Sequence, residues 1–362
     1  MERFSVRAPG RVCLFGEHSD YLGLDVIPAA INLTIQIQCS RRDDMTINVN
    51  YVDLHEEDAF EIDSEDTSYR HNRDYLRSAY NIVKRRGMPP NSGWDLEVTG
   101  NIPIAAGLSS SSALTVAGII AFARMSRNAP LLPREAAQLA FEAEVLEFGE
   151  SGGMMDHFAS AYGGIIHVDL GADYKTTRLP AKIEGLVIGD SLEKKEDTVA
   201  DLKRIRDAVE REYRSIEASI PDFGQRTTAT MMVEGATPDN PSEDRRMALA
   251  SLRNRDLTQR AFEFLMDETP DAEKLGHLLD LHHYLLKHGL KRSTPKIEAM
   301  ISAAKSAGAL GCKINGSGGG GTMLALAPGK EEIVADAIRE SGGIPYRVKI
   351  GSGAGIEEGY TT

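Results

Sequence analysis

A run of small and hydroxyl-bearing residues, Pro103 to Ala113, contains one glycine and four consecutive serines. Glycine lets a backbone approach a ligand closely, and serine is favourable at a helix N-terminus. The free N–H groups and the positive dipole end of a helix N-terminus can hold a phosphate. No Gly-Lys-Ser/Thr follows, so the run is not the usual P-loop. The residues alone leave two interpretations open, a phosphate cradle and a capped helix.

The segments on either side of this run must position it. Apolar residues alternate from Trp94 toward Ile104, which predicts a strand, and the small apolar residues from Ala113 to Met125 predict a buried helix. The same spacing rules predict further helices at 74–86, 133–148, 195–217, 244–267 and 271–288.

Composition excludes several classes of protein. The chain has 362 residues and a formal net charge of −13, which disfavours a nucleic-acid-binding protein because that class needs a basic patch. Three widely spaced cysteines suggest neither a disulfide framework nor a zinc site. The N-terminus lacks a long apolar run, and no segment approaches the ~20 apolar residues of a membrane span. We therefore expect a cytoplasmic protein without a membrane or nucleic-acid partner, either a monomer or a homodimer.

Two further stretches favour the phosphate interpretation. Ala8 to Tyr21 contains Gly-Glu-His-Ser-Asp-Tyr, and Lys313 to Thr322 contains four consecutive glycines. Together with the serine run, these stretches resemble the three motifs of the GHMP kinase family, in the family order and across nearly the whole chain. These small-molecule kinases include galactokinase and mevalonate kinase, and the Glu-His-Ser-Asp-Tyr version resembles the galactokinase branch most.

The resemblance implies an α+β fold with two lobes and an active site between them. The N-terminal lobe, residues 1–188, would be of the ribosomal protein S5 domain 2 type and carry the serine/glycine phosphate loop. The C-terminal lobe, residues 189–362, would be ferredoxin-like and carry the glycine-rich loop 316–321. The predicted strands and helices are compatible with this fold, although their alternation alone would equally suggest a doubly wound sheet.

Phosphoryl transfer from ATP needs a cradle for the nucleotide, a metal and an oriented acceptor. Ala143-Glu144 followed by Gly-Met-Met-Asp ending at Asp156 resembles a galactokinase pattern with the same separation. This implies Glu144 as a Mg²⁺ ligand beside the hydroxyl of Ser111, with Ser110 as the fallback; the alternative for Glu144 is a solvated helix position. The resemblance implies that ATP is held by Gly107, Leu108, Ser109, Ser110, Ser111 and Ser112, together with Gly318 and Gly319.

Asp156 is the implied catalytic group, because it would orient or deprotonate the acceptor hydroxyl. An acid in apolar surroundings needs a partner, and the resemblance supplies Arg11, which would keep the carboxylate ionised. The alternative is a purely structural ion pair. The polar loop residues Glu17, His18 and Asp20, with Gly153, are implied to hold the hydroxyls of a sugar, although such residues also occur in ordinary surface loops.

Three histidines on one predicted helix, His282, His283 and His288, invite a zinc interpretation. His282 and His283 point about 100° apart on a helix, and no Glu occupies the position that a His-Glu-x-x-His site requires. We therefore interpret these histidines as structural.

One departure from the galactokinase pattern bears on the substrate. Galactokinases carry a Tyr-x-x-Arg-Arg stretch after the domain crossover, and the matching residues 189–198 contain none. We predict a kinase that uses ATP and Mg²⁺ to phosphorylate the anomeric hydroxyl of galactose or a galactose-like sugar. The alternatives are a kinase for another small alcohol, such as a sugar derivative or mevalonate, and a catalytically silent sugar sensor. Asp20-Tyr21 argues against mevalonate, and the joint presence of Arg11, Glu144 and Asp156 argues against the sensor.

Overall fold

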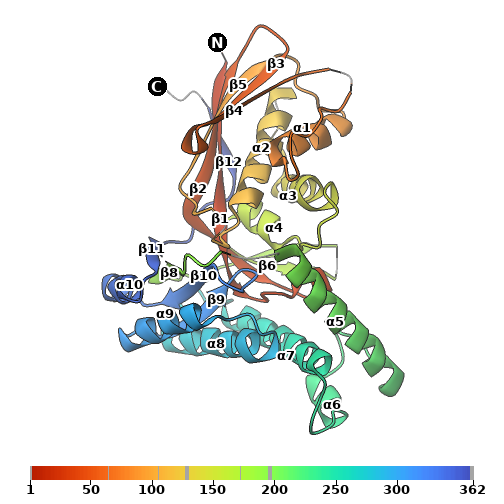
Figure 1. Cartoon of the computed structure of the whole chain (residues 1–362), viewed down its shortest axis with the longest axis vertical. Helices are drawn as coiled ribbons and strands as arrows, with labels where there is room; N and C mark the ends of the chain where they lie inside the picture. Colours follow the sequence, from red (N-terminus) through yellow and green to blue (C-terminus); the bar gives the residue numbers. More distant parts are fainter. Residues whose placement is uncertain are drawn as a thin grey trace.

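Two β-sheets organise the chain in the computed structural model, which describes residues 2–63, 65–104, 106–126, 130–171, 173–194 and 198–358 (Figure 1). The larger sheet runs in the order β12-β1-β2-β5-β3-β4, and β6 pairs with β2 and β7. All its pairs are antiparallel except β3 with β5. Its strands are β1 (Arg3–Phe15), β2 (Ile27–Arg41), β3 (Thr46–Tyr51), β4 (Glu56–Glu61), β5 (Trp94–Gly100), β6 (Ile165–Asp169), β7 (Lys175–Leu179) and β12 (Gly355–Glu358).

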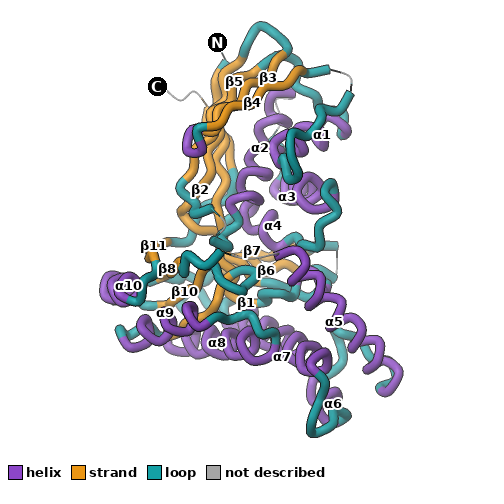
Figure 2. Tube along the Cα trace, in the orientation of Figure 1, coloured by secondary structure: helices purple, strands orange, loops and turns teal. Residues whose placement is uncertain are grey.

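Helices gather on one side of this sheet (Figure 2). The central one, α2 (Ser110–Ser126), packs against β1 and β2, and its residues from Ala113 to Met125 are nearly all buried, as the sequence predicts. The predicted helix 133–148 is instead a regular helix followed by a π-helical turn, Glu142–Leu146. The helices of this layer are α1 (Tyr75–Arg85), α2, α3 (Pro133–Phe141) and α4 (Met155–Tyr162).

The smaller sheet has four antiparallel strands in the order β11-β8-β10-β9. Helices α8 and α9 pack on β9, and α10 packs on β8 and β11. The second core contains buried residues of this sheet and of α5, α7, α9 and α10, whereas the buried leucines of α8 belong to the core of the larger sheet. Its strands are β8 (Leu186–Asp190), β9 (Gly311–Asn315), β10 (Thr322–Leu326) and β11 (Ile344–Val348). Its helices are α5 (Thr198–Ser219), α6 (Thr230–Gly235), α7 (Glu243–Phe264), α8 (Ala272–Tyr284), α9 (Pro295–Ser306) and α10 (Glu331–Glu340).

This arrangement agrees with the predicted two-lobed α+β class, but the expected boundary between residues 188 and 189 falls inside β8. All five residues of β8 pair with β10 and β11, and we therefore propose a boundary just before Leu186. The chain also returns to the larger sheet at its far end, where β12 pairs with β1. The first three residues of the predicted helix 195–217 lie outside the described residues.

β1 joins the two halves of the molecule. Its first residues pair with β12 and β2 in the larger sheet, and the side chains of β9 in the smaller sheet contact its last residues. Among the described residues, no helix has the length and apolar character that crossing a membrane requires.

Candidate active site

A cavity of about 900 Å³ collects residues from all three sequence motifs. It is bordered by the end of β1, the loop before α2, the start of α4 and the loop after β9. Most of the residues singled out in the sequence line it: Arg11, Glu17, His18, Asp20, Gly107, Leu108, Ser109, Ser110, Ser111, Ser112, Glu144, Gly153 and Asp156.

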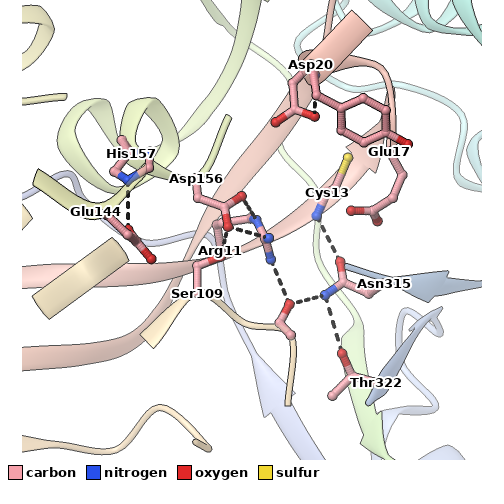
Figure 3. Close-up of polar contacts among 12 residues, drawn as sticks. Arg11, Cys13, Glu17, Asp20, Ser109, Glu144, Asp156, His157, Asn315 and Thr322 are labelled. Atoms are coloured by element: carbon pink, nitrogen blue, oxygen red, sulfur yellow. Dashed lines mark hydrogen bonds and ion pairs between the residues drawn. The ribbon is translucent and has the colours of Figure 1, made fainter. Parts of the chain in front are cut away.

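Arg11 and Asp156 form a two-pronged ion pair at the centre of this cavity (Figure 3). The Arg11 Nε lies 2.6 Å from Asp156 Oδ1, and Nη2 lies 2.7 Å from Oδ2. The remaining nitrogen, Nη1, donates to the Gly107 carbonyl oxygen at 2.7 Å, and the Arg11 backbone N–H donates to the carbonyl of Leu108. The guanidinium therefore ties the carboxylate to the phosphate loop in a fixed geometry.

The carboxylate of Asp156 is held in its ionised form. It stands in the first turn of α4, where the helix dipole favours a negative charge. Ser109 Oγ donates to its Oδ2 at 2.5 Å. Withdrawal from water acts to raise the pKa of Asp156, but the charge of Arg11 and the Ser109 hydrogen bond outweigh it and leave the pKa below its usual value.

The phosphate loop brings the N-terminus of α2 to the cavity. Gly107 and Ser109 have positive φ angles of 82° and 61°, and the helix begins directly afterwards. The first N–H groups of a helix have no partner within it, so those of Ser110 to Ser112 are available to a ligand at this wall. The geometry thus suits an anion, as the sequence suggests.

Glu144 lies in the π-helical turn, largely buried, where it lines the cavity. His157 Nε2 is 2.7 Å from Glu144 Oε2, and Figure 3 shows this pair apart from the Arg11 cluster. The imidazole therefore fixes the orientation of the carboxylate and occupies one of its oxygens. His157 Nδ1 is buried and makes no hydrogen bond in the described part of the chain.

Asp20 differs from Asp156 in its surroundings. It lies against Gly153 so closely that a Cβ at that glycine would come within 2.0 Å of Asp20 Oδ2. Withdrawal from water, with the nearby charge of Asp156, raises the pKa of Asp20 to about 6. Glycine at position 153 is therefore a requirement of the Asp20 side chain's position.

The polar loop of Glu17, His18 and Asp20, called the acceptor loop from here on for its expected role, is held from the smaller lobe. Glu17 Oε2 lies 2.9 Å from Lys313 Nζ on β9, and both side chains are buried. Asn254 on α7 donates to the Glu17 carbonyl at 2.8 Å. His18 Nδ1 is 2.8 Å from the Tyr21 hydroxyl. Glu17 thus has a charged partner that the sequence does not predict, whereas Asp20 accepts a hydrogen bond from the backbone N–H of Tyr21.

The glycine-rich loop contributes to the cavity through its first residues, Gly316 and Ser317. A nucleotide contact is expected for Gly318 and Gly319, but both pack against Arg292. The Gly319 N–H donates to the Arg292 carbonyl at 2.8 Å. A Cβ on Gly318 would come within 2.7 Å of the Arg292 side chain. Their predicted role stays a prediction.

The three helical histidines have neighbours of their own. His282 is fully buried with Nδ1 3.1 Å from the Leu14 carbonyl, and His283 Nε2 lies 2.9 Å from Glu298. His288 lies beside the ring of Tyr284. In the described ranges, no three His, Cys, Asp or Glu side chains gather as a metal cluster would require.

Three residues near the cavity were not identified from the sequence: His157, Lys313 and Asn315. His157 directly follows the catalytic candidate, and the other two stand two positions apart just before the glycine-rich loop. That spacing puts both side chains on one face of a strand. A lysine and an asparagine in an otherwise apolar strand are the signal that could have identified them.

Comparison with known proteins agrees with this geometry. Residues 74–164 match the GHMP kinases N terminal domain, and residues 261–344 match the GHMP kinases C terminal domain. Residues 1–41, which include the acceptor loop, match the galactokinase galactose-binding signature.

Whole-chain relatives and solved structures extend the likeness. The chain is 31% identical to the mevalonate kinase of Thermococcus gammatolerans over 98% of this chain and 99% of that one. It is 28% identical to the galactokinase of Actinobacillus succinogenes over 93% and 87%, respectively. The structure of Lactococcus lactis galactokinase complexed with galactose superposes with a TM-score of 0.84, 22% identity and coverage of 98% and 95%, which confirms the predicted fold. Matches of this extent to both domains and to full-length relatives show that the chain belongs to the GHMP kinase family, whose members transfer a phosphoryl group to an alcohol.

Proposed function

We propose that this protein is an ATP- and Mg²⁺-dependent sugar kinase that phosphorylates the anomeric hydroxyl of galactose or a galactose-like sugar. The observation that carries the proposal is the placement of Asp156, which touches Arg11 and the phosphate loop and shares its cavity with Asp20 of the acceptor loop. A carboxylate between a phosphate site and a hydroxyl-binding loop is what phosphoryl transfer to a sugar needs.

The donor side suits a nucleotide with its metal. Kinases of this family use ATP as the phosphate donor, generally with Mg²⁺. The oxygen donors that line the cavity fit this ion, which prefers oxygen ligands and keeps several waters. The Ser111 hydroxyl and the Glu144 carboxylate would hold Mg²⁺, which offsets the charge of the phosphates when bound. The N–H groups at the start of α2 would bind the phosphate oxygens.

Asp156 would accept a hydrogen bond from the sugar hydroxyl and take its proton as the new bond to the γ-phosphorus forms and the bond from that phosphorus to the bridging oxygen breaks, which releases ADP. Its low pKa makes it a weak base toward a free hydroxyl, so its first role is to orient the nucleophile. Transfer of the proton becomes favourable only late, because the attacking oxygen grows more acidic as it bonds to phosphorus. Arg11 would keep Asp156 ionised and correctly oriented until the proton is transferred.

The acceptor side supports a sugar. Residues 1–41 match the galactose-binding signature, and Asp20, with His18, borders the cavity. An ionised Asp20 can accept two hydroxyl hydrogen bonds, which discriminate strongly against an epimer that misplaces a hydroxyl. The absence of a Tyr-x-x-Arg-Arg stretch in residues 189–198 makes a substituted or truncated galactose as suitable as galactose itself.

A second candidate is mevalonate, because the mevalonate kinase of Thermococcus gammatolerans is 31% identical over nearly the whole chain. One experiment separates the two: ADP release is measured with ATP and Mg²⁺ and, in turn, galactose, glucose, N-acetylgalactosamine, galacturonate, arabinose and mevalonate. We expect turnover with an aldose of galactose-like configuration and an anomeric phosphate in the NMR spectrum of the product. Turnover of mevalonate alone would replace the sugar proposal with the second candidate.

A further inference from the structure

The two faces of β9 have different chemistry. Cys312 and Ile314 belong to the apolar core of the smaller lobe. Lys313 and Asn315, on the opposite face, are polar and fully buried, and their side chains reach β1. Burying a charge and an amide is unfavourable unless each has partners, so the contacts of these two side chains decide what they do.

Both side chains hold the backbone of Cys13. Lys313 Nζ donates to the Cys13 carbonyl at 2.7 Å, and Asn315 Oδ1 accepts from the Cys13 N–H at 2.9 Å (Figure 3 shows the second contact). Opposite Cys13 on β2 stands Pro28, which has no N–H to donate, and the pairing of β1 with β2 becomes irregular directly afterwards. The side chains of β9 thus satisfy both backbone polar groups of Cys13 at a point where the pairing of β1 with β2 is irregular.

Each side chain then continues to a different wall of the cavity. Lys313 Nζ pairs with Glu17 Oε2 at 2.9 Å in the acceptor loop. Asn315 Nδ2 donates at 3.1 Å to the Gly107 carbonyl oxygen in the phosphate loop, the same oxygen that Arg11 Nη1 contacts at 2.7 Å. One carbonyl oxygen therefore holds two donors from opposite ends of the chain, and one strand touches both substrate-binding loops.

We propose that Lys313 and Asn315 are positioning residues with separate tasks: Lys313 sets the acceptor loop through Glu17, and Asn315 sets the phosphate loop through Gly107. The inference rests on the proposed division of the cavity into an acceptor side and a nucleotide side. It does not depend on which alcohol is the acceptor, because both contacts act on the loops.

The separate tasks predict separate kinetic effects. Asn315→Asp keeps the oxygen that receives the Cys13 N–H but replaces the donor to Gly107 with a second oxygen. We expect the KM for ATP and the calorimetric Kd for ADP to rise by at least about tenfold, while the KM for the acceptor stays nearly constant. The reason is that the Nδ2 group, which donates to the Gly107 carbonyl and, at 3.4 Å, to the Thr322 hydroxyl, is lost, and neither partner belongs to the acceptor loop. Lys313→Met should raise the KM for the acceptor and leave the KM for ATP nearly constant, because it leaves the buried Glu17 carboxylate without its partner.

Cys312→Ala is the matched control, because it removes a buried side chain from the same strand on the face that does not contact β1. This variant should unfold at a lower temperature and leave both KM values unchanged. If Lys313 and Asn315 had a purely structural role, all three variants would have a lower unfolding temperature and unchanged KM values. Equal effects of Lys313→Met on both KM values, or of Asn315→Asp on both, would overturn the division of tasks.

A double-mutant cycle tests whether Lys313 acts through Glu17. If it does, Lys313→Met added to Glu17→Gln should change the KM for the acceptor no further than Glu17→Gln alone, because the carboxylate that Lys313 orients is already neutral. The double variant buries no unpaired charge, so it carries the comparison even where Lys313→Met alone fails to fold. A full additional rise in KM on the Glu17→Gln background would contradict the proposal.

The sugar proposal and this one fail in different ways. The acceptor panel identifies the alcohol that the parent enzyme uses, and the KM comparison is then made with that alcohol. Turnover of mevalonate alone overturns the sugar proposal and leaves the positioning test intact. Conversely, a sugar kinase whose Asn315→Asp variant binds ADP as tightly as the parent overturns the role of Asn315.

Discussion

Asp156 and Asp20 are two carboxylates of one cavity, and their surroundings push their pKa values in opposite directions. Withdrawal from water acts to raise both. Asp156 has the Arg11 guanidinium and the Ser109 hydroxyl to offset it. Asp20 has the N–H of Tyr21 and faces the negative charge of Asp156. The difference shows that partners, more than depth in the protein, decide which carboxylate stays charged.

This contrast assigns different work to the two groups. The lowered pKa keeps Asp156 ionised at neutral pH, where it would orient the nucleophile. Asp20 has a pKa raised to about 6, so any hydrogen bond that it makes to the acceptor would depend on pH. Substitutions of Asp156 should therefore mainly lower kcat, whereas substitutions of Asp20 should change kcat/KM for the acceptor and the pH dependence of stability.

The largest effect is expected for Asp156→Asn, which removes the charged side of the contrast. The amide cannot accept a proton, and we expect kcat to fall by about 10²–10⁴-fold while the Kd for ADP hardly changes. Steady-state kinetics and calorimetry check this. Ser109→Ala, which removes only one hydrogen bond to Asp156, is the matched control and should have a much smaller effect on kcat. A variant with parental turnover would remove Asp156 from the mechanism.

The next effect is expected for Asp20→Ala, which removes the other carboxylate. Losing a charged acceptor for sugar hydroxyls should reduce transition-state stabilisation by about 1.5–3 kcal/mol, measured as kcat/KM for the acceptor. Tyr21→Phe removes a neighbouring hydroxyl and leaves the carboxylate in place, so it should lower kcat/KM less than Asp20→Ala does. Equal values of kcat/KM for Asp20→Ala and the parent would mean that the acceptor binds elsewhere.

A smaller effect is expected for Glu144→Gln, a third carboxylate of the cavity that has a histidine partner. A neutral amide is a poor ligand for Mg²⁺, so the Mg²⁺ concentration for half-maximal rate should rise about tenfold. Binding of Mn²⁺ in the presence of ADP, followed by electron paramagnetic resonance, measures the same change without turnover. Glu142→Gln, on the same turn but paired with Arg86 at the surface, is the control. Overlapping curves for Glu144→Gln and the parent would exclude Glu144 as a ligand.

The smallest effect concerns stability and pH. An aspartate has a pKa near 3.9 in an unfolded chain and Asp20 one of about 6 in the folded protein, so the folded state holds this proton more tightly. The contribution of Asp20 to stability is therefore full below about pH 4 and is lost as the pH rises through about 6. At about pH 8, Asp20→Asn should raise the free energy of unfolding by about 1–2 kcal/mol relative to the parent, which is measured as a higher Tm. At about pH 4, the Tm of the variant should not exceed that of the parent. Identical Tm differences at the two pH values would mean that Asp20 titrates normally.

The sequence predicts the parts of this site that depend on local pattern. The apolar run of α2 and the serine-rich turn before it have the helix and the position expected of them. The approach of Arg11 to Asp156 followed from family resemblance, because 145 residues separate the two and no local pattern joins them.

Other features depend on contacts that no pattern of single residues reveals. The pairing of Glu17 with Lys313 spans 296 residues. The four glycines after Ser317 look alike in the sequence, and only the folded structure shows that Gly318 and Gly319 lie against Arg292. The short apolar strand β8 has no local mark that assigns it to the smaller sheet, which is why the lobe boundary was expected within it.

The long reach of the contacts made by β1 has a consequence for how the protein is synthesised. A nascent chain leaves the ribosome N-terminus first, at about 5–20 residues per second. β2 can pair with β1 as soon as it is translated, but the side of β1 that contacts β9 and β12 stays without these partners for much longer, since Asn315 follows Cys13 by 302 residues. A partly made chain therefore cannot assemble the site, and one edge of β1 stays open to other strands during translation.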